Sequence, residues 1–153
     1  MIGLKAALFF LAAPGTVCGL IPWLLTRWAP FDQMDFVTGR WPGLAIMVLG
    51  GGGLVWCFCD FVRKGKGTPN PYDAPKKLVT NGLYRVSRNP MYVAILVVIV
   101  GEAQFFQRLI LFAWGAVAWF VFHLRVLLHE EPALERLFGD QWAQYRASVR
   151  RWL

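Results

Sequence analysis

Arg85 and Arg88 lie beside an Asn89-Pro90 step, where a helix is predicted to begin. Asparagine is favourable at the N-cap of a helix, and proline is favourable at the first helical position. The exposed amides and the positive dipole end of such a helix attract anions, and arginine binds carboxylates through two parallel hydrogen bonds. The stretch therefore predicts a site for an anionic group at the edge of the apolar run that follows Pro90.

A second charged group, Glu130 and Glu131, ends another apolar run and is preceded by Arg125 and His129. Ionisable side chains this close to an apolar segment are costly unless they are paired or functional. The acidic pair could instead only favour the start of a helix after Pro132, and Arg125 could simply extend along the apolar surface. Carboxylates accept hydrogen bonds from ammonium groups and ribose hydroxyls. The acidic and basic groups together therefore suit a zwitterionic, nucleoside-bearing ligand, among others.

Long apolar runs separated by short charged clusters indicate an integral membrane protein. The chain has 153 residues, of which 57% are hydrophobic and 16% aromatic, whereas an average soluble domain is roughly half apolar. A helix of about 20 apolar residues crosses the hydrocarbon layer of a membrane. We expect an all-α, single domain over residues 1–153 with about four transmembrane helices. The predicted spans lie near residues 2–25, 41–62, 90–106 and 109–128.

The basic residues predict how these spans are oriented. The loop at residues 63–89 is rich in lysine and arginine, and Asp73 is its one acidic residue. Pro132 is expected to end the fourth span, and residues 131–150 then read as an amphipathic helix interrupted near Gly139. Because positively charged segments stay in the cytoplasm, the loop, this helix and both termini are predicted to be cytoplasmic. Arg88 and the two glutamates would then meet at one membrane face.

Other features have ordinary structural explanations. The net charge of +7 does not indicate nucleic-acid binding, because most basic residues flank apolar segments. Cys18, Cys57 and Cys59 all lie within apolar runs, and the spacing of the last two prevents them from sharing a metal on a helix. We therefore predict no metal site. The glycines at residues 50–53 favour close helix packing over a phosphate-binding loop, and His123 favours a packing role.

Two stretches resemble the isoprenylcysteine carboxyl methyltransferase and phospholipid methyltransferase superfamily. Its signature is a Gly-x-Tyr-Arg element, then Arg-His-Pro or Arg-Asn-Pro, then a residue and Tyr. The first stretch reads Leu78-Val-Thr-Asn-Gly-Leu-Tyr-Arg-Val-Ser-Arg-Asn-Pro-Met-Tyr92. The second comprises Glu130-Glu131-Pro-Ala-Leu134, Phe138-Gly139, Tyr145 and Val149-Arg-Arg-Trp152. Gly67-Thr68-Pro69 resembles the bacterial branch, so the resemblance covers roughly residues 65–152 and implies a bacterial inner (cytoplasmic) membrane protein.

The resemblance implies an S-adenosylmethionine-dependent methyltransferase with its site on the cytoplasmic side. By residue-to-residue transfer, the cofactor would be held by Arg88, Asn89, Pro90, Tyr92, Glu130 and Glu131. The catalytic candidates are Arg85 and Glu131, and the substrate-contacting candidates are Tyr84, Arg125, His129 and Tyr145. Methyl transfer needs alignment more than a strong base, so Arg85, Arg88 and Tyr92 are predicted to position the reactants, and Glu131 is the one candidate base.

The acceptor is left open between a lipophilic carboxylate, an amine and a thiol. Asn89 stands where the prenylcysteine enzymes have His, which argues against prenylcysteine as the substrate, and Trp142 stands where a first Tyr often precedes Tyr145. Two alternatives remain. One is a nicotinamide-dependent membrane reductase of lipids, since membrane sterol reductases look distantly similar to this chain around the carboxyl-terminal spans. The other is a non-catalytic scaffold that binds anionic lipid. The expected partners are membrane lipids and a lipophilic substrate, with the oligomeric state undetermined.

Overall fold

The computed structural model describes residues 12–27, 40–60, 63 and 77–153, and this part of the chain is helical without strands. A π-helical segment, η1 (Thr16–Leu20), leads into α2 (Ile21–Thr26). The remaining elements are α3 (Arg40–Asp60), η3 (Gly82–Arg85), α4 (Pro90–Phe106), α5 (Leu109–Arg125), η4 (Val126–Glu130), α6 (Glu131–Phe138) and α7 (Asp140–Ser148). The predicted helix over residues 90–106 is therefore confirmed at both ends.

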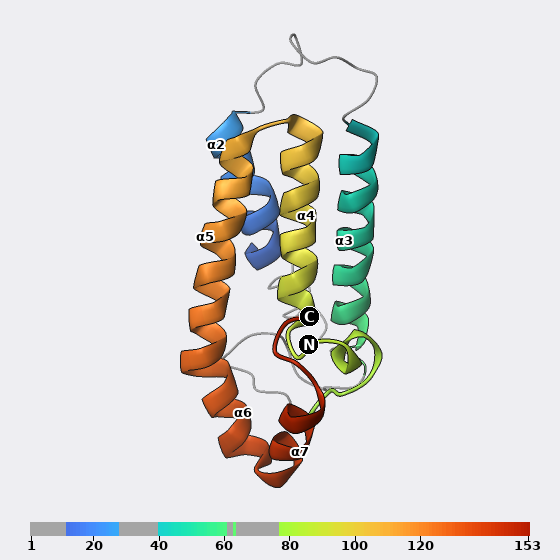
Figure 1. The fold of residues 1–153 in the computed structure, drawn as a ribbon, viewed down its shortest axis with the longest axis vertical. Coiled ribbons are helices and arrows are strands. Elements are labelled where there is room, and N and C mark those ends of the chain that lie inside the picture. The colour runs from blue at the N-terminus through green and yellow to red at the C-terminus, as the bar shows by residue number, and fades with distance from the viewer. Residues whose placement is uncertain (1–11, 28–39, 61–62, 64–76) are drawn as a thin grey trace.

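The long helices α3, α4 and α5 lie side by side along the long axis of the molecule, with α2 beside one end of α5 (Figure 1). Because α3 and α5 run opposite to α4, the first residues of α4 lie level with the last residues of α3 and α5. We call this end of the bundle the foot. The segments η3, α6, α7 and the residues that follow α7 all gather there (Figure 1).

Glycines bring α3 and α4 into backbone contact. A Cβ atom added at Gly43 would lie 2.5 Å from the backbone nitrogen of Phe105, and one added at Gly101 would lie 2.6 Å from that of Met47. One added at Gly50 would lie 2.8 Å from the backbone nitrogen of Val98. The predicted packing role is thus confirmed for Gly50. Gly51 and Gly52 face open space, with nothing within 4 Å of an added Cβ.

Membrane crossing is supported by two helices within the described residues. The helix Arg40–Asp60 and the continuous helix Leu109–Phe138 are long and apolar enough to span a bilayer, while Ala12–Thr26 and Pro90–Phe106 are apolar but shorter. Large side chains such as Leu109 are exposed on the outside of the bundle, as a hydrocarbon surrounding allows. Residues 2–11 of the expected first span, and 61–62 of the second, lie outside the described part of the chain.

Two predicted boundaries near the C-terminus are wrong. The helix that begins at Leu109 does not end at Pro132 but continues through η4 into α6, while the end of the fourth span near residue 128 stays a prediction. The wider π-helical turn of η4 gives the proline ring room, and Pro132 then occupies the first turn of α6, where its missing N–H costs little. The predicted interruption at Gly139 is confirmed, with a φ of +48°. Helix α7 ends at Ser148, before the predicted residue 150, because Val149 is extended.

Candidate functional site

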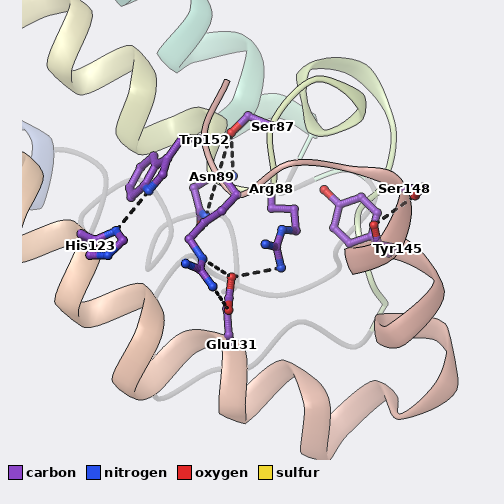
Figure 2. Close-up of polar contacts among 9 residues, drawn as sticks. Ser87, Arg88, Asn89, His123, Glu131, Tyr145, Ser148 and Trp152 are labelled. Carbon is purple, nitrogen blue, oxygen red and sulfur yellow. Dashed lines mark hydrogen bonds and ion pairs between the residues drawn. The ribbon is translucent and has the colours of Figure 1, made fainter.

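The last residues of the chain return to the start of α4. We call residues 149–153 the C-terminal segment. The backbone N–H of Arg88 donates to the carbonyl of Arg150 at 2.9 Å. Ser87 Oγ and Asn89 Nδ2 donate to the carbonyl of Arg151 at 3.2 and 3.0 Å (Figure 2). Asn89 does occupy the N-cap position of α4, but its side chain makes no capping hydrogen bond. It fastens the C-terminal segment instead.

Glu131 lies between two arginines at the foot. Arg151 donates from Nε to Oε1 at 2.8 Å and from Nη2 to Oε2 at 2.9 Å, and Arg88 Nη1 lies 3.0 Å from Oε1 (Figure 2). The prediction that Arg88 meets the acidic pair is therefore confirmed for Glu131. The side chains of Arg88 and Glu131 are only 8% and 10% exposed. We call these three residues the Glu131 cluster, and its formal charge is +1.

Arg88 keeps hydrogen-bond donors to spare in this cluster. Its Nε and Nη1 are buried without a hydrogen-bond acceptor among the described residues, so the contact with Glu131 is an ion pair rather than an aligned hydrogen bond. The guanidinium carbon lies 5.5 Å from the centre of the Trp142 ring, a cation–π arrangement. Burial lowers the pKa of Arg88, and the neighbouring Glu131 carboxylate opposes that shift. A buried guanidinium with unused donors is suited to an anionic ligand.

Glu130 has separate partners on the neighbouring side of the same helix. Its Oε1 accepts hydrogen bonds from the Tyr92 hydroxyl and from Arg125 Nε, the latter at 2.9 Å. The Tyr92 ring stacks on Phe122 with ring centres 4.5 Å apart, which fixes the direction of its hydroxyl. We call Tyr92, Arg125 and Glu130 the Glu130 cluster. Its ion pair is more accessible than that of Glu131, with side chains 41% and 31% exposed.

Tyr84 and Tyr145, two predicted substrate residues, are buried against each other. The Tyr145 hydroxyl donates to the backbone carbonyl of Tyr84 at 2.7 Å and so joins α7 to η3. Burial raises the pKa of Tyr145 to about 12, although nearby Arg88 lowers it, and the phenol therefore stays protonated as a donor at neutral pH. Gly82 begins η3 with a φ of +63°, and a side chain there would collide with Asp60.

Arg85 and His129 are exposed, and neither side chain forms an ion pair or hydrogen bond among the described residues. The structure thus brings Arg88, Asn89, Pro90, Tyr92, Arg125, Glu130 and Glu131 together at the foot and leaves these two at its surface. The roles predicted for all of these residues remain predictions.

The C-terminal segment contributes two residues that sequence reasoning did not select. Arg151 holds Glu131, and Trp152 Nε1 donates to His123 Nδ1 at 3.2 Å. His123 also stacks on Trp119, with ring centres 5.3 Å apart. The sequence signal was the Val-Arg-Arg-Trp run itself, but it does not say which arginine faces the glutamates. Arg150 is exposed and contributes its backbone carbonyl.

Residues 38–141 match the phospholipid methyltransferase family, and the chain belongs to this family. Among curated proteins it is similar to protein-S-isoprenylcysteine O-methyltransferases A and B of Arabidopsis thaliana. The former is 34% identical over 79 residues, which are 51% of this chain and 40% of the relative. The latter is 34% identical over 74 residues, 48% and 37% of the two chains. A probable protein-S-isoprenylcysteine O-methyltransferase of Oryza sativa subsp. indica is 33% identical over 79 residues, 51% and 41%.

The matched stretch spans about two fifths of each of these plant relatives. No solved structure matches the chain. The family match ends at residue 141, so α7 beyond that point and the C-terminal segment lie outside it.

Proposed function

We propose that this protein is a membrane-embedded, S-adenosylmethionine-dependent methyltransferase that acts on a lipophilic acceptor. The observation that carries the proposal is the Glu131 cluster at the foot of an apolar helix bundle, in which Arg88 and Glu131 are buried and Arg151 is partly exposed. Burying charged groups is costly unless they are fully paired and hydrogen-bonded. Here one guanidinium is incompletely paired, and the family match supplies the class of reaction.

The residues present fit the groups of S-adenosylmethionine. The net positive Glu131 cluster and the spare donors of Arg88 suit its carboxylate, next to the first turn of α4 at Asn89 and Pro90. The more accessible Glu130 suits its ammonium group or ribose hydroxyls, since Tyr92 and Arg125 bind only one carboxylate oxygen, Oε1. When bound, this cofactor supplies a methyl group on a sulfonium centre.

The polar residues of the foot would then bind and orient rather than abstract protons. Two guanidinium groups stabilise the charged form of Glu131, so it has little tendency to take a proton from an acceptor. An amine must lose a proton during methylation, whereas a carboxylate or thiolate need not. The arrangement therefore favours the latter acceptors. Arg85 is exposed and lies shortly before Arg88 in the sequence. We propose that it orients the acceptor.

An apolar groove between the helices supports a lipophilic acceptor. The groove has a volume of about 320 Å³ and opens between α3, α4 and α5. It is lined by Ile46, Val93, Leu96, Val97, Val100, Trp119, Trp152 and Leu153. Trp152 thus lines the groove while the preceding residue, Arg151, contacts Glu131. A hydrocarbon chain lying in the groove would bring its polar end toward the foot.

The membrane arrangement completes the proposal. We place four spans in one domain, with the foot, the loop at residues 63–89 and helices α6 and α7 on the cytoplasmic side of a bacterial inner membrane. The positive-inside rule supports this orientation, because the basic residues concentrate in those segments. The acceptor would then reach the site from the bilayer and the cofactor from the cytoplasm.

Ligand binding tests the proposal. The detergent-purified protein is titrated with S-adenosylmethionine, S-adenosylhomocysteine and NADPH, and the titrations are repeated with Arg88→Ala and Glu131→Ala. Glu135→Ala is the matched control, because it removes an exposed carboxylate one turn further along α6. We expect saturable binding of both S-adenosyl ligands that the two site variants lose and the control retains. Binding of NADPH alone would indicate a reductase, and binding of none would indicate a scaffold.

The acceptor class is identified separately. The protein is incubated with S-adenosylmethionine carrying a labelled methyl group and a membrane lipid extract, and labelled products are separated. Base-labile label indicates a methyl ester, and base-stable label indicates a methylated amine or thiol.

A further inference from the structure

The C-terminal segment lies at the foot, against the residues that begin α4. Three hydrogen bonds from consecutive residues, Ser87 to Asn89, end on the carbonyls of Arg150 and Arg151. Trp152 adds a fourth contact to His123. A segment held at this many points has a defined register, so the side chain of each of its residues has a defined direction.

That register separates two neighbouring arginines. Arg151 points to Glu131, and its side chain is 29% exposed, whereas Arg150 is exposed to solvent. The Arg151 guanidinium takes both carboxylate oxygens in the two-point geometry that arginine and carboxylate prefer, at 2.8 and 2.9 Å. Its hydrogen bonds to Glu131 raise the pKa of Arg151, so this residue stays charged.

The contact between Arg151 and Glu131 determines how the donors of Arg88 are used. Because Arg151 satisfies both oxygens of Glu131, Arg88 makes a charge contact with Oε1 but keeps buried Nε and Nη1 without acceptors. Without Arg151, both carboxylate oxygens of Glu131 would be open to hydrogen bonds from those donors of Arg88. Arg88 would then turn its donors to that carboxylate and present fewer of them to a ligand.

We propose that Arg151 is a positioning residue of the cofactor site, which holds Glu131 so that Arg88 remains available to the carboxylate of the cofactor. The inference rests on the proposed function. It also makes the C-terminal segment, which lies beyond the family match, a wall of the site.

The test compares the two neighbouring arginines in the full-length protein. S-Adenosylhomocysteine is titrated against the parent, Arg151→Ala and Arg150→Ala, which remove equal charge and keep the backbone carbonyls. Because the donors of Arg88 would then turn to Glu131, the dissociation constant should rise about tenfold or more for Arg151→Ala. Arg150→Ala should leave it within about twofold. Equal effects of the two substitutions would overturn the proposal.

Two further variants distinguish positioning from general support of the fold. Arg151→Lys keeps the charge but not the two-point geometry, and we expect it to fold like the parent yet bind several-fold more weakly. In a Glu131→Gln background, Arg151→Ala should add little, because the residue acts through Glu131. Independent, multiplicative effects in that background would contradict the inference. If the parent itself binds no S-adenosyl ligand, the proposed function fails, and that outcome is distinct from equal binding by the two alanine variants.

Discussion

The α3–α4 interface and the foot of the bundle hold the protein together in opposite ways. At the interface, Gly43, Gly50 and Gly101 leave no room for a side chain, and backbone meets backbone. At the foot, Arg88 and Glu131 are buried, and together with the partly exposed Arg151 they meet through charged side chains. Close packing of small residues holds the interface together, and pairing of charges holds the foot together.

This difference separates stability from binding. Tight apolar packing gives no group that a polar ligand could recognise, so its residues should matter for folding alone. Buried charges are a poor source of stability, because desolvation offsets their attraction, and they are retained where they have another task. Substitutions at the interface should therefore lower stability alone, whereas substitutions at the foot should lower ligand binding, with a loss of stability only where a buried charge loses its partner.

Glu131→Ala is expected to have the largest effect. It leaves Arg88 and Arg151 without their shared carboxylate, and breaking a buried ion pair costs about 3–5 kcal/mol. Thermal unfolding in detergent should show a lowered midpoint, and S-adenosylhomocysteine binding should be lost. Glu131→Gln preserves the shape and should recover part of the stability but not the binding. Full binding by the alanine variant would refute a ligand role for the foot.

Gly43→Ala tests the other side of the comparison. Its methyl group would meet backbone atoms of α4, and overpacking of this kind costs about 1–3 kcal/mol. Gly51→Ala, on the same helix but facing open space, should instead stabilise by about 0.5–1 kcal/mol, because alanine is the better helix former. Denaturation midpoints report the difference. The folded fraction of Gly43→Ala should bind S-adenosylhomocysteine like the parent, and weakened binding there would link the two regions.

Tyr92→Phe removes one hydroxyl from the Glu130 cluster and keeps the ring stacked on Phe122. Glu130 is partly exposed and keeps its bond to Arg125, so stability should change little, while the orientation of Glu130 toward the ligand is lost. We expect about a tenfold loss in affinity for S-adenosylhomocysteine with little change in unfolding temperature. Phe122→Leu is the complementary variant, since it removes the stacking and leaves the hydroxyl. A large fall in unfolding temperature for Tyr92→Phe would show that the Glu130 cluster serves stability rather than ligand binding.

Asn89→Ala should have the smallest effect. It deletes one of two side-chain hydrogen bonds to the Arg151 carbonyl, leaving that from Ser87, and a neutral hydrogen bond contributes about 0.5–1.5 kcal/mol. Affinity for S-adenosylhomocysteine should fall a few-fold, and the double variant Asn89→Ala with Ser87→Ala should bind it more weakly still. An unchanged double variant would show that the C-terminal segment does not depend on these bonds.

Much of the fold follows from local sequence. The helix over residues 90–106 begins at Pro90, the interruption falls at Gly139, and both depend on the backbone preferences of single residues. The meeting of Arg88 with Glu131 followed from charge topology, because both groups were predicted at one membrane face. Pro132 does not end the helix, because a proline is harmless in a first helical turn. Only the π-helical turn before it places Pro132 in such a turn.

The finer site required tertiary structure. Sequence alone determined an all-helical, apolar chain of the phospholipid methyltransferase type with acidic and basic groups close together. It did not determine that Gly51 is dispensable for packing where Gly50 is not, or that Asn89 binds the end of the chain. Nor did it distinguish Arg150 from Arg151. Outside a helix or strand, no fixed periodicity decides where neighbouring side chains point, and here the hydrogen bonds from Ser87–Asn89 decide which arginine faces Glu131.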